Sequence, residues 1–332
     1  RQMCIRDRVI VREYKETVSR ETHKRTIAKM SSYSDTPIAE AAERASRIIH
    51  RMDLDDLPRP AFRRMLSVAN QKGGVGKTTS AVNLAAALGL YGMRVLVVDL
   101  DPQGNASTAL GAEHRSGTPS SYELLLGDCK LEECVQKSTA GENVFVVPAT
   151  IDLAGSEIEL VGMVARENRL KDALDDDYLD ELDVDFVFID CPPSLGLLTI
   201  NSMVAANEIL LPIQCEYYAL EGVGQLLNNI NLIQMHLNKN LHLSTILLTM
   251  FDGRTKLADQ VASEVRNHFG EIVLDTIIPR SVKVSEAPGF GQTVIQFDPG
   301  STGAKTYLEA AREIIMRGAR EEEEYREEVG ED

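Results

Sequence analysis

A short segment rich in glycine and lysine is where residue types first suggest chemistry. Asn70–Thr79 reads NQKGGVGKTT and lies between an apolar run, Met65–Ala69, and an alanine-rich helical pattern, Thr79–Leu90. A strand that turns into a helix through such a loop is the setting of a phosphate-binding loop. The glycines let main-chain N–H groups surround phosphate oxygens, and the helix N-terminus adds partial positive charge. The segment therefore predicts a nucleoside triphosphate site.

The lysines and threonines of this segment have distinct expected roles. Lys77 can reach the β- and γ-phosphates, and the hydroxyl of Thr78 can ligate Mg²⁺. The strict pattern would place glycine at position 71, whereas this chain has Gln71 followed by an additional lysine, Lys72. That combination resembles the deviant Walker A box of the ParA/MinD group of ATPases. The expected nucleotide-binding residues are Gly73, Gly74, Val75, Gly76, Lys77, Thr78 and Thr79.

Two predicted strands each end in a carboxylate. Arg94–Leu100 runs into Asp101, and Phe186–Ile189 ends at Asp190. Ligands of doubly wound sheets bind at the carboxyl ends of the strands, so both acids should lie beside the phosphate loop. Asp101 is expected to orient the water that attacks the γ-phosphate, and Asp190 to hold Mg²⁺ through its water shell.

The chain after Asp190 reads Cys191-Pro192-Pro193-Ser194. The two prolines cannot continue a strand or a helix, so the chain should turn off as a switch segment that senses the γ-phosphate. Cys191 has no neighbouring His or Lys in the sequence, and it is expected to be a small buried residue rather than a nucleophile.

Alternating strands and helices from Arg64 onward must position these groups. The fold class predicted is α/β: a doubly wound, mainly parallel twisted sheet with helices on both faces. The other strands are expected at Val144–Val147, Glu208–Pro212, Ser244–Met250 and Val273–Ile278, and the other helices near 152–174, 197–206, 220–237, 257–269 and 302–317.

Length and charge bound the possibilities further. The 332 residues suit one large domain, predicted over 65–317. The net charge of −16 resides mainly in Asp175–Asp185 and Glu321–Asp332, each with a net charge of −7, so the remainder is nearly neutral and compatible with a DNA-binding face. Residues 318–332 are predicted to be an acidic disordered tail.

Cysteine usage and hydropathy favour a cytoplasmic protein. The five cysteines are odd in number and lack CxxC spacing, which argues against a zinc site or a disulfide framework and predicts reduced thiols. No apolar run approaches the ~20 residues that span a bilayer, and the N-terminus shows no signal-peptide pattern.

The three motifs in order resemble those of ParA chromosome- and plasmid-partitioning ATPases, from about Met65 to Met316. The likeness includes Asp101–Asn105, Leu153–Leu160 and Gln214–Gly222. It implies a homodimer in which Lys72 reaches the phosphates bound by the other subunit, together with ATP, Mg²⁺ and a ParB-type centromere-binding partner that stimulates hydrolysis. Pro279 and the turn Phe297–Pro299 are expected to flank the adenine.

The resemblance also implies a nucleoid-associated protein that binds double-stranded DNA without reading its sequence, through its phosphates. Basic residues in the C-terminal part are the candidates for this contact: Arg254, Lys256, Arg266, Arg280, Lys283 and Lys305.

Two alternatives from other classes were weighed against this interpretation. A MinD-like membrane-cycling ATPase would need a basic amphipathic C-terminal helix, whereas this C-terminus begins Arg320-Glu321-Glu322, a sequence that anionic lipid would repel. An iron–sulfur reductase of the nitrogenase iron-protein kind would need cysteines that bridge a cluster between subunits, and Cys129 and Cys134 lie in a poorly patterned stretch. No membrane partner is therefore expected.

The N-terminal 64 residues differ from the rest in being polar and without strand periodicity. Residues 1–8 resemble a translated sequencing-library adaptor, and Val18–Thr22 can be encoded by DNA containing the parS site that ParB binds. The hypothesis is that residues 1–29 are non-native or untranslated sequence and that Met30 is the start. Residues 30–64 would then be a polar extension with one amphipathic helix, Ile38–Met52.

Overall fold

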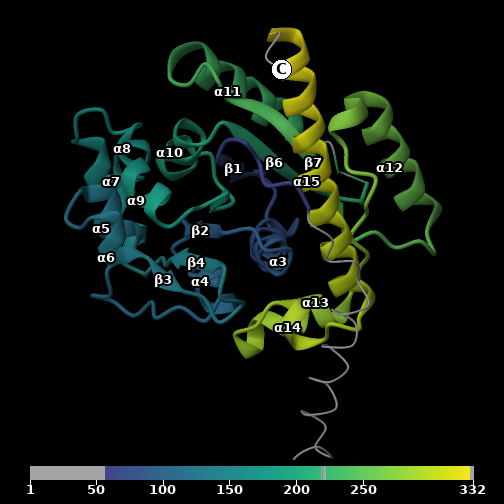
Figure 1. Cartoon of the computed structure of the whole chain (residues 1–332), viewed down its shortest axis with the longest axis horizontal. Helices are drawn as coiled ribbons and strands as arrows, with labels where there is room; N and C mark the ends of the chain where they lie inside the picture. The colour runs from purple at the N-terminus through teal and green to yellow at the C-terminus, as the bar shows by residue number, and fades with distance from the viewer. Residues whose placement is uncertain (1–56, 218, 220–221, 330–332) are drawn as a thin grey trace, which may run out of the picture. The chain divides into compact units, whose positions relative to one another are not determined.

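A seven-stranded sheet organises the described part of the chain (Figure 1). The computed structural model describes residues 57–217, 219 and 222–329, so the helix expected at Ile38–Met52 lies outside the described residues. The strand order is β3-β4-β2-β5-β1-β6-β7, and every described pairing is parallel except that of β3 with β4. The predicted doubly wound, mainly parallel α/β fold is confirmed. The strands are β1 (Arg64–Val68), β2 (Val95–Asp99), β3 (Gln136–Lys137), β4 (Val144–Val147), β5 (Phe186–Asp190), β6 (Glu208–Gln214) and β7 (His242–Thr249).

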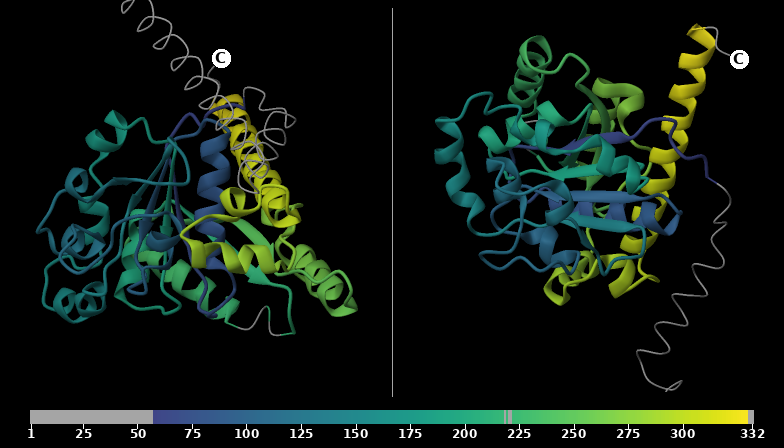
Figure 2. Two further views of the ribbon diagram at one scale, coloured as in Figure 1. Left: turned by 90° about the horizontal axis from the view of Figure 1, so that it is seen from below. Right: turned by 60° about the vertical axis from the view of Figure 1, so that its left-hand side comes forward.

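Helices cover both faces of the sheet, which is why β2, β4 and β5 are apolar except for the aspartates that end β2 and β5. Every residue of β2, β4 and β5 is buried, as expected for parallel strands enclosed by helices. On one face, α3 (Lys77–Leu90) packs against α15 (Thr302–Val329) (Figure 2). The other face holds α5 (Ser121–Leu126), α6 (Leu131–Cys134), α7 (Leu153–Val161), α8 (Arg169–Ala173), α9 (Asp176–Glu181), α10 (Leu197–Ala205), α11 (Val223–His236) and α12 (Lys256–Phe269).

Three further short helices lie at the loops around the carboxyl edge of the sheet: α4 (Asn105–Ala109), α13 (Val282–Glu286) and α14 (Val294–Phe297). Helices of four or five residues carry too little apolar periodicity to be predicted from sequence. None of the three was expected.

The strand predicted at Val273–Ile278 is wrong. Only two isolated bridges occur there, joining Val273 to Ile246 and Pro279 to Phe251. The backbone N–H groups of Asp275 and Thr276 donate to the carboxylate of Glu313 in α15, at 2.7 and 3.0 Å. Glu313 thus interrupts the pairing with β7, to which the N–H groups of Leu274 and Ile278 still donate, at 2.9 Å each.

The long helix expected over 152–174 is divided into α7 and α8. Gly162 ends α7, and Ala165 adopts a left-handed conformation with φ of 52°, which an α-helix cannot contain. At the other end of the chain, α15 continues to Val329, so the disordered tail predicted from residue 318 is helical over 318–329. Glutamate and arginine are good helix formers, and no proline interrupts them.

The prediction that all thiols are reduced is wrong for one pair. Cys129, just before α6, and Cys134, the last residue of α6, are joined in a disulfide. Their separation of five residues lets a single turn of chain bring the two side chains together. Cys191 and Cys215 are free and buried, as expected for Cys191.

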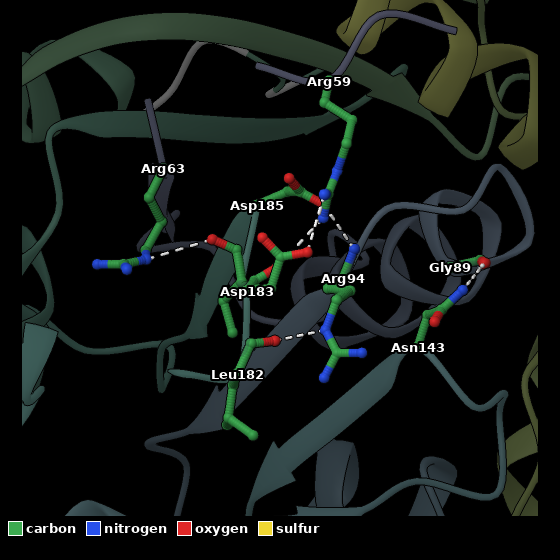
Figure 3. Close-up of polar contacts among 9 residues, drawn as sticks. Arg59, Arg63, Gly89, Arg94, Asn143, Leu182, Asp183 and Asp185 are labelled. Carbon is green, nitrogen blue, oxygen red and sulfur yellow. Dashed lines mark hydrogen bonds and ion pairs between the residues drawn. The ribbon is translucent and has the colours of Figure 1, made fainter. Parts of the chain in front are cut away.

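Arg59 and Arg63, in the segment before β1, form ion pairs and hydrogen bonds with the acidic stretch that precedes β5 (Figure 3). Arg59 contacts Asp183 at 2.8 Å and Asp185 at 2.9 Å, and Arg63 donates to the carbonyl oxygen of Val184. Asp185 is buried and also accepts from the backbone N–H of Arg94 at 2.7 Å. Part of the excess acid of residues 175–185 is thus neutralised within the chain.

Replacing Asp185 by alanine should destabilise the fold. The change leaves the N–H of Arg94 and the guanidinium of Arg59 without their shared acceptor, which costs about 2 kcal/mol. Urea unfolding measures the difference. Asp183→Asn is the matched control, because Asp183 is 65% exposed, surface ion pairs contribute little, and asparagine tolerates the left-handed backbone at residue 183, where φ is 52°. Equal losses in both variants would contradict this account.

Candidate nucleotide-binding site

The predicted phosphate loop connects β1 to α3 with the backbone that such a loop needs. Gly74 and Gly76 have φ values of 73° and 90°, in the left-handed region that favours glycine. Gly76 immediately precedes α3, so the free N–H groups of the first helical turn lie next to the loop. The hydroxyl of Thr249 donates to the carbonyl oxygen of Val75 at 2.8 Å, which fixes the loop against the end of β7.

Lys77 lies inside this site rather than on the surface. Its side chain is 7% exposed, and its Nζ donates to the carbonyl oxygen of Lys72 at 3.4 Å. Burial lowers the pKa of Lys77, whereas the negative charges of Asp190 and Asp101 act in the opposite direction. The ammonium is therefore held close to both predicted carboxylates at the carboxyl edge of the sheet.

Asp190 ends β5 and is fully buried. Neither of its carboxylate oxygens accepts a hydrogen bond within the described residues. Burial and then the charge of Asp99 raise the pKa of Asp190 well above its usual range, while the Thr78 hydroxyl and the Lys77 ammonium oppose that rise. A buried carboxylate without partners is a group that a cation would stabilise.

The donor set beside Asp190 suits a magnesium ion that is completed by phosphate and water. No cluster of three or more His, Cys, Asp or Glu that could hold a metal occurs among the described residues. Mg²⁺ is commonly bound by one or two carboxylates together with substrate phosphates and water, and it prefers oxygen. Asp190 and the Thr78 hydroxyl supply such oxygens, so these residues fit the ion.

Asp99, which ends β2, and Asp101, which follows it, have different roles. Asp101 is 9% exposed, and its Oδ1 accepts from the backbone N–H of Gln103 at 3.0 Å. Asp99 accepts from the N–H and the hydroxyl of Ser107, at 2.8 and 2.7 Å, and from the N–H of Asp101 at 3.1 Å. Burial raises the pKa of Asp99 to about 6. Asp99 thus holds the turn, and Asp101 remains beside Lys77.

An adjacent cavity of about 230 Å³ lies next to the phosphate loop. Its lining combines loop and helix residues with apolar side chains, including Gly76, Thr79, Met250, Pro279, Val284 and Tyr307. Apolar walls of this kind suit the flat faces of an adenine ring. Pro279, which is expected to flank the adenine, is one of the residues that line this cavity. The turn Phe297–Pro299 does not contribute to this cavity, and Phe297 stacks on Phe290 instead, with centroids 5.0 Å apart.

The predicted DNA-contacting residues fall into two places. Arg254 is paired with Asp252 at 2.7 Å and Arg280 with Glu216 at 2.9 Å, and the two arginines follow Phe251 and Pro279, which are joined by an isolated bridge. The Arg254 guanidinium holds the pKa of Asp252 at about 2. Lys283 pairs with Glu286 at 3.3 Å.

Arg266 is in the last turn of α12, roughly 15 Å along the helix from its start. It donates to the carbonyl oxygen of Asp275 at 2.9 Å, and it lines a larger hollow of about 630 Å³ together with Arg64, at the first residue of β1. Arg266 therefore lies toward the amino ends of the strands, apart from the nucleotide cavity. Lys256 and Lys305 form no ion pair with another of the described residues.

Sequence reasoning missed three supports of the site. Tyr307 of α15 lines the cavity and lies 3.5 Å from the hydroxyl of Ser80. Ser107 organises Asp99, and Thr249 holds the phosphate loop. Small hydroxyl residues far apart in the chain carry no local signal of this role. Only the position of Thr249 at the end of a predicted strand could have indicated it.

The phosphate loop, its two carboxylates and the apolar cavity define a P-loop nucleotide-binding protein of the deviant Walker A class. A family model described as an AAA domain matches residues 63–243. The chain is 50% identical to the sporulation initiation inhibitor protein Soj of Bacillus subtilis over 255 residues, which cover 77% of this chain and 99% of Soj. It is 48% identical to the chromosome partitioning protein ParA of Myxococcus xanthus, covering 76% of this chain and 88% of that protein. The chain belongs to the ParA/Soj family of chromosome-partitioning ATPases.

The solved structures agree with this fold. The structure of cobyrinic acid a,c-diamide synthase from Mycobacterium smegmatis, with bound ADP and magnesium, superimposes with a TM-score of 0.64 at 41% identity. The match covers 75% of this chain and 93% of that one.

Proposed function

We propose that this protein is an ATP-dependent DNA-segregation switch. In the proposed cycle, ATP and Mg²⁺ binding closes two subunits face to face, and the dimer binds nucleoid DNA through its phosphates. A ParB-type centromere-binding partner stimulates hydrolysis, and the subunits then leave the DNA. The observation that carries the proposal is the meeting of Lys77, Asp101 and Asp190 beside a phosphate loop, in a chain half identical to Soj.

Each residue of the site has a proposed role. Lys77 and the N–H groups from Gly73 to Thr79 hold the phosphates, Thr78 and Asp190 hold the metal, and Asp101 orients the attacking water. Bound Mg²⁺ supplies neutralisation of the phosphate charge. Lys72 extends to the phosphates of the other subunit, and no hydrogen bond or ion pair of its ammonium competes with that role among the described residues.

The relatives favour partitioning over other uses of the same site. The structure that carries a synthase name is 41% identical, and its ADP and magnesium support the same nucleotide site. The partitioning proteins Soj and ParA match at 50% and 48% identity over nearly the same share of the chain.

A MinD-like membrane cycle is the alternative. Within the described residues, no helix is both long enough and apolar enough to cross a bilayer. The end of α15 is acidic rather than basic, which disfavours a surface anchor on anionic lipid. Sedimentation with anionic liposomes and ATP tests this alternative directly, and ATP-dependent co-sedimentation would favour it.

Gel filtration with light scattering tests the central step. A non-hydrolysable ATP analogue with Mg²⁺ should convert the protein from monomer to dimer, and non-specific DNA should bind only to the dimer. A protein that stays monomeric with the analogue would contradict the proposed function.

Non-specific DNA affinity should fall when Arg254 is replaced by alanine. Its ion pair with Asp252 is exposed and so is readily exchanged for a phosphate contact. We expect a loss that is uniform across DNA sequences, with the slope of log affinity against log salt reduced by about 1. Fluorescence anisotropy over a salt series measures both quantities.

Arg115→Ala is the matched control for this experiment. Arg115 is 88% exposed, compared with 87% for Arg254, and it also pairs with a nearby acid, Glu113. It should bind DNA as the wild type does. A loss for Arg254→Ala that is confined to one DNA sequence would argue against phosphate contact. Lys283→Ala should behave as Arg254→Ala does.

A further inference from the structure

We infer that α7 couples subunit contact to the nucleotide site. A second copy of the chain packs on the exposed apolar stripe of α7, and Glu157 on the inner flank of the same helix positions the segment that follows Asp190. The inference rests on the proposed dimer and adds to it a contact surface and a positioning residue.

The apolar stripe consists of Ile151, Ile158, Val161 and Val164, on and immediately beside α7. Ile158 is 81% exposed and Val164 is 90% exposed, and the other two exceed 60%. The buried residues of α7 are Leu153, Ser156 and Leu160, which face the core under the helix. Ile151, Ile158 and Val161 recur at a helical spacing on the opposite side. Large apolar side chains gathered on one exposed helix face indicate a contact surface.

The start of α7 is tied to the edge of the sheet that holds the nucleotide site. The N–H of Ala149, between β4 and α7, donates to the hydroxyl of Ser107 at 2.9 Å. That hydroxyl in turn donates to Asp99 at 2.7 Å. Two hydrogen bonds therefore connect the loop before α7, at Ala149, with Asp99, which holds the turn that carries Asp101.

Glu157 connects α7 to the switch segment. Its side chain lies so close to Gly196 that a Cβ at residue 196 would collide with the carboxylate. Its Oε1 is buried and has no hydrogen-bond partner among the described residues. Gly196 is the N-cap of α10 and lies six residues after Asp190, so the negative charge of Glu157 lies at the favourable end of that helix. A displacement of α7 would therefore move the segment beside the metal ligand.

A second copy of this chain is the occupant that the stripe fits. In a two-fold dimer the same surface of each subunit meets its counterpart, and an uncharged stripe can do so without repulsion. The stripe begins at Ile151, just after the carboxyl end of β4, and so starts at the edge of the sheet where Gly73 and Gly74 are exposed and where Lys72 must reach the other subunit. DNA would require cations instead.

Ile158→Asp tests the contact surface. Light scattering with a non-hydrolysable ATP analogue and Mg²⁺ should show a dimer dissociation constant raised at least tenfold, while analogue binding to the monomer stays within twofold of wild type. Unchanged analogue binding shows that the variant is folded. Met235→Asp on α11 is the matched control, because Met235 is 62% exposed and lies on another helix; it should dimerise normally.

Each outcome separates this inference from the proposed function. A wild-type protein that stays monomeric overturns the proposed function. A wild type that dimerises together with an Ile158→Asp variant that dimerises equally well overturns the contact surface and leaves the proposed function intact. An Ile158→Asp variant that dimerises normally but no longer responds to a ParB-type partner would also overturn the subunit contact surface. The stripe would then be assigned to that partner.

Glu157 is tested by a kinetic separation. Glu157→Ala should lower kcat at least fivefold while KM for ATP stays within twofold, because the switch segment loses its support and the nucleotide contacts remain. Glu157→Gln fills the same space and should recover most of the rate. Equal changes in kcat and KM, or no recovery with glutamine, would overturn the positioning role.

Discussion

Lys77→Ala is expected to remove most of the affinity for nucleotide. The ammonium of Lys77 is buried beside the phosphate loop, and alanine would leave the β- and γ-phosphates without their charge-assisted donor. Loss of that contact corresponds to about 3 kcal/mol, or roughly a 100-fold weaker affinity for ATP. Titration calorimetry with a non-hydrolysable analogue and Mg²⁺ measures the loss.

Lys72→Ala provides the contrast. Lys72 precedes the loop glycines, and its proposed target is the nucleotide of the other subunit. Its alanine variant should therefore bind the analogue as a monomer within about threefold of wild type and fail to dimerise. If Lys72→Ala lost nucleotide affinity as completely as Lys77→Ala, both lysines would serve the same subunit and the cross-subunit role would be wrong.

Asp101→Ala is expected to separate binding from hydrolysis. Asp101 lies near Lys77 but forms no part of the phosphate loop, so ATP binding and dimerisation should persist. Turnover should fall by about 100-fold or more, the range lost when a positioned catalytic base is removed. Phosphate release under saturating ATP, with DNA and a ParB-type partner present, measures the rate.

Asp101→Asn shows whether the residue acts on water or only on its own turn. The Oδ1 of Asp101 accepts from the N–H of Gln103 at 3.0 Å, and asparagine can keep that hydrogen bond. A slow asparagine variant supports a role for the negative charge in orienting water. An asparagine variant that hydrolyses ATP as fast as wild type would show that Asp101 only stabilises its own turn and does not orient water.

The parts of the site that were predictable are those with a local signature. Gly76 needs a left-handed backbone before a helix, and Asp190 ends a run of four apolar residues. Both features can be read within ten residues of sequence. The order of the parallel strands then brings their carboxyl ends together, because right-handed crossovers leave few alternatives.

The parts that failed depend on contacts between distant segments. Val273–Ile278 has the composition of a strand, but the carboxylate of Glu313 in α15 accepts from two of its backbone N–H groups, those of Asp275 and Thr276. The spatial separation of the basic residues could not be predicted either. Arg254 and Arg266 are near in sequence, yet α12 carries Arg266 toward the opposite end of the sheet. No single-sequence pattern reports such partners.

The nucleotide site draws on both ends of the chain, and this has a consequence for synthesis. Gly76 contributes early, whereas Thr249, Pro279 and Tyr307 complete the loop anchor and the cavity. A ribosome must therefore release almost the entire polypeptide before ATP can find a finished pocket. Nascent chains that already carry the phosphate loop therefore lack a complete nucleotide cavity until Tyr307 has been synthesised.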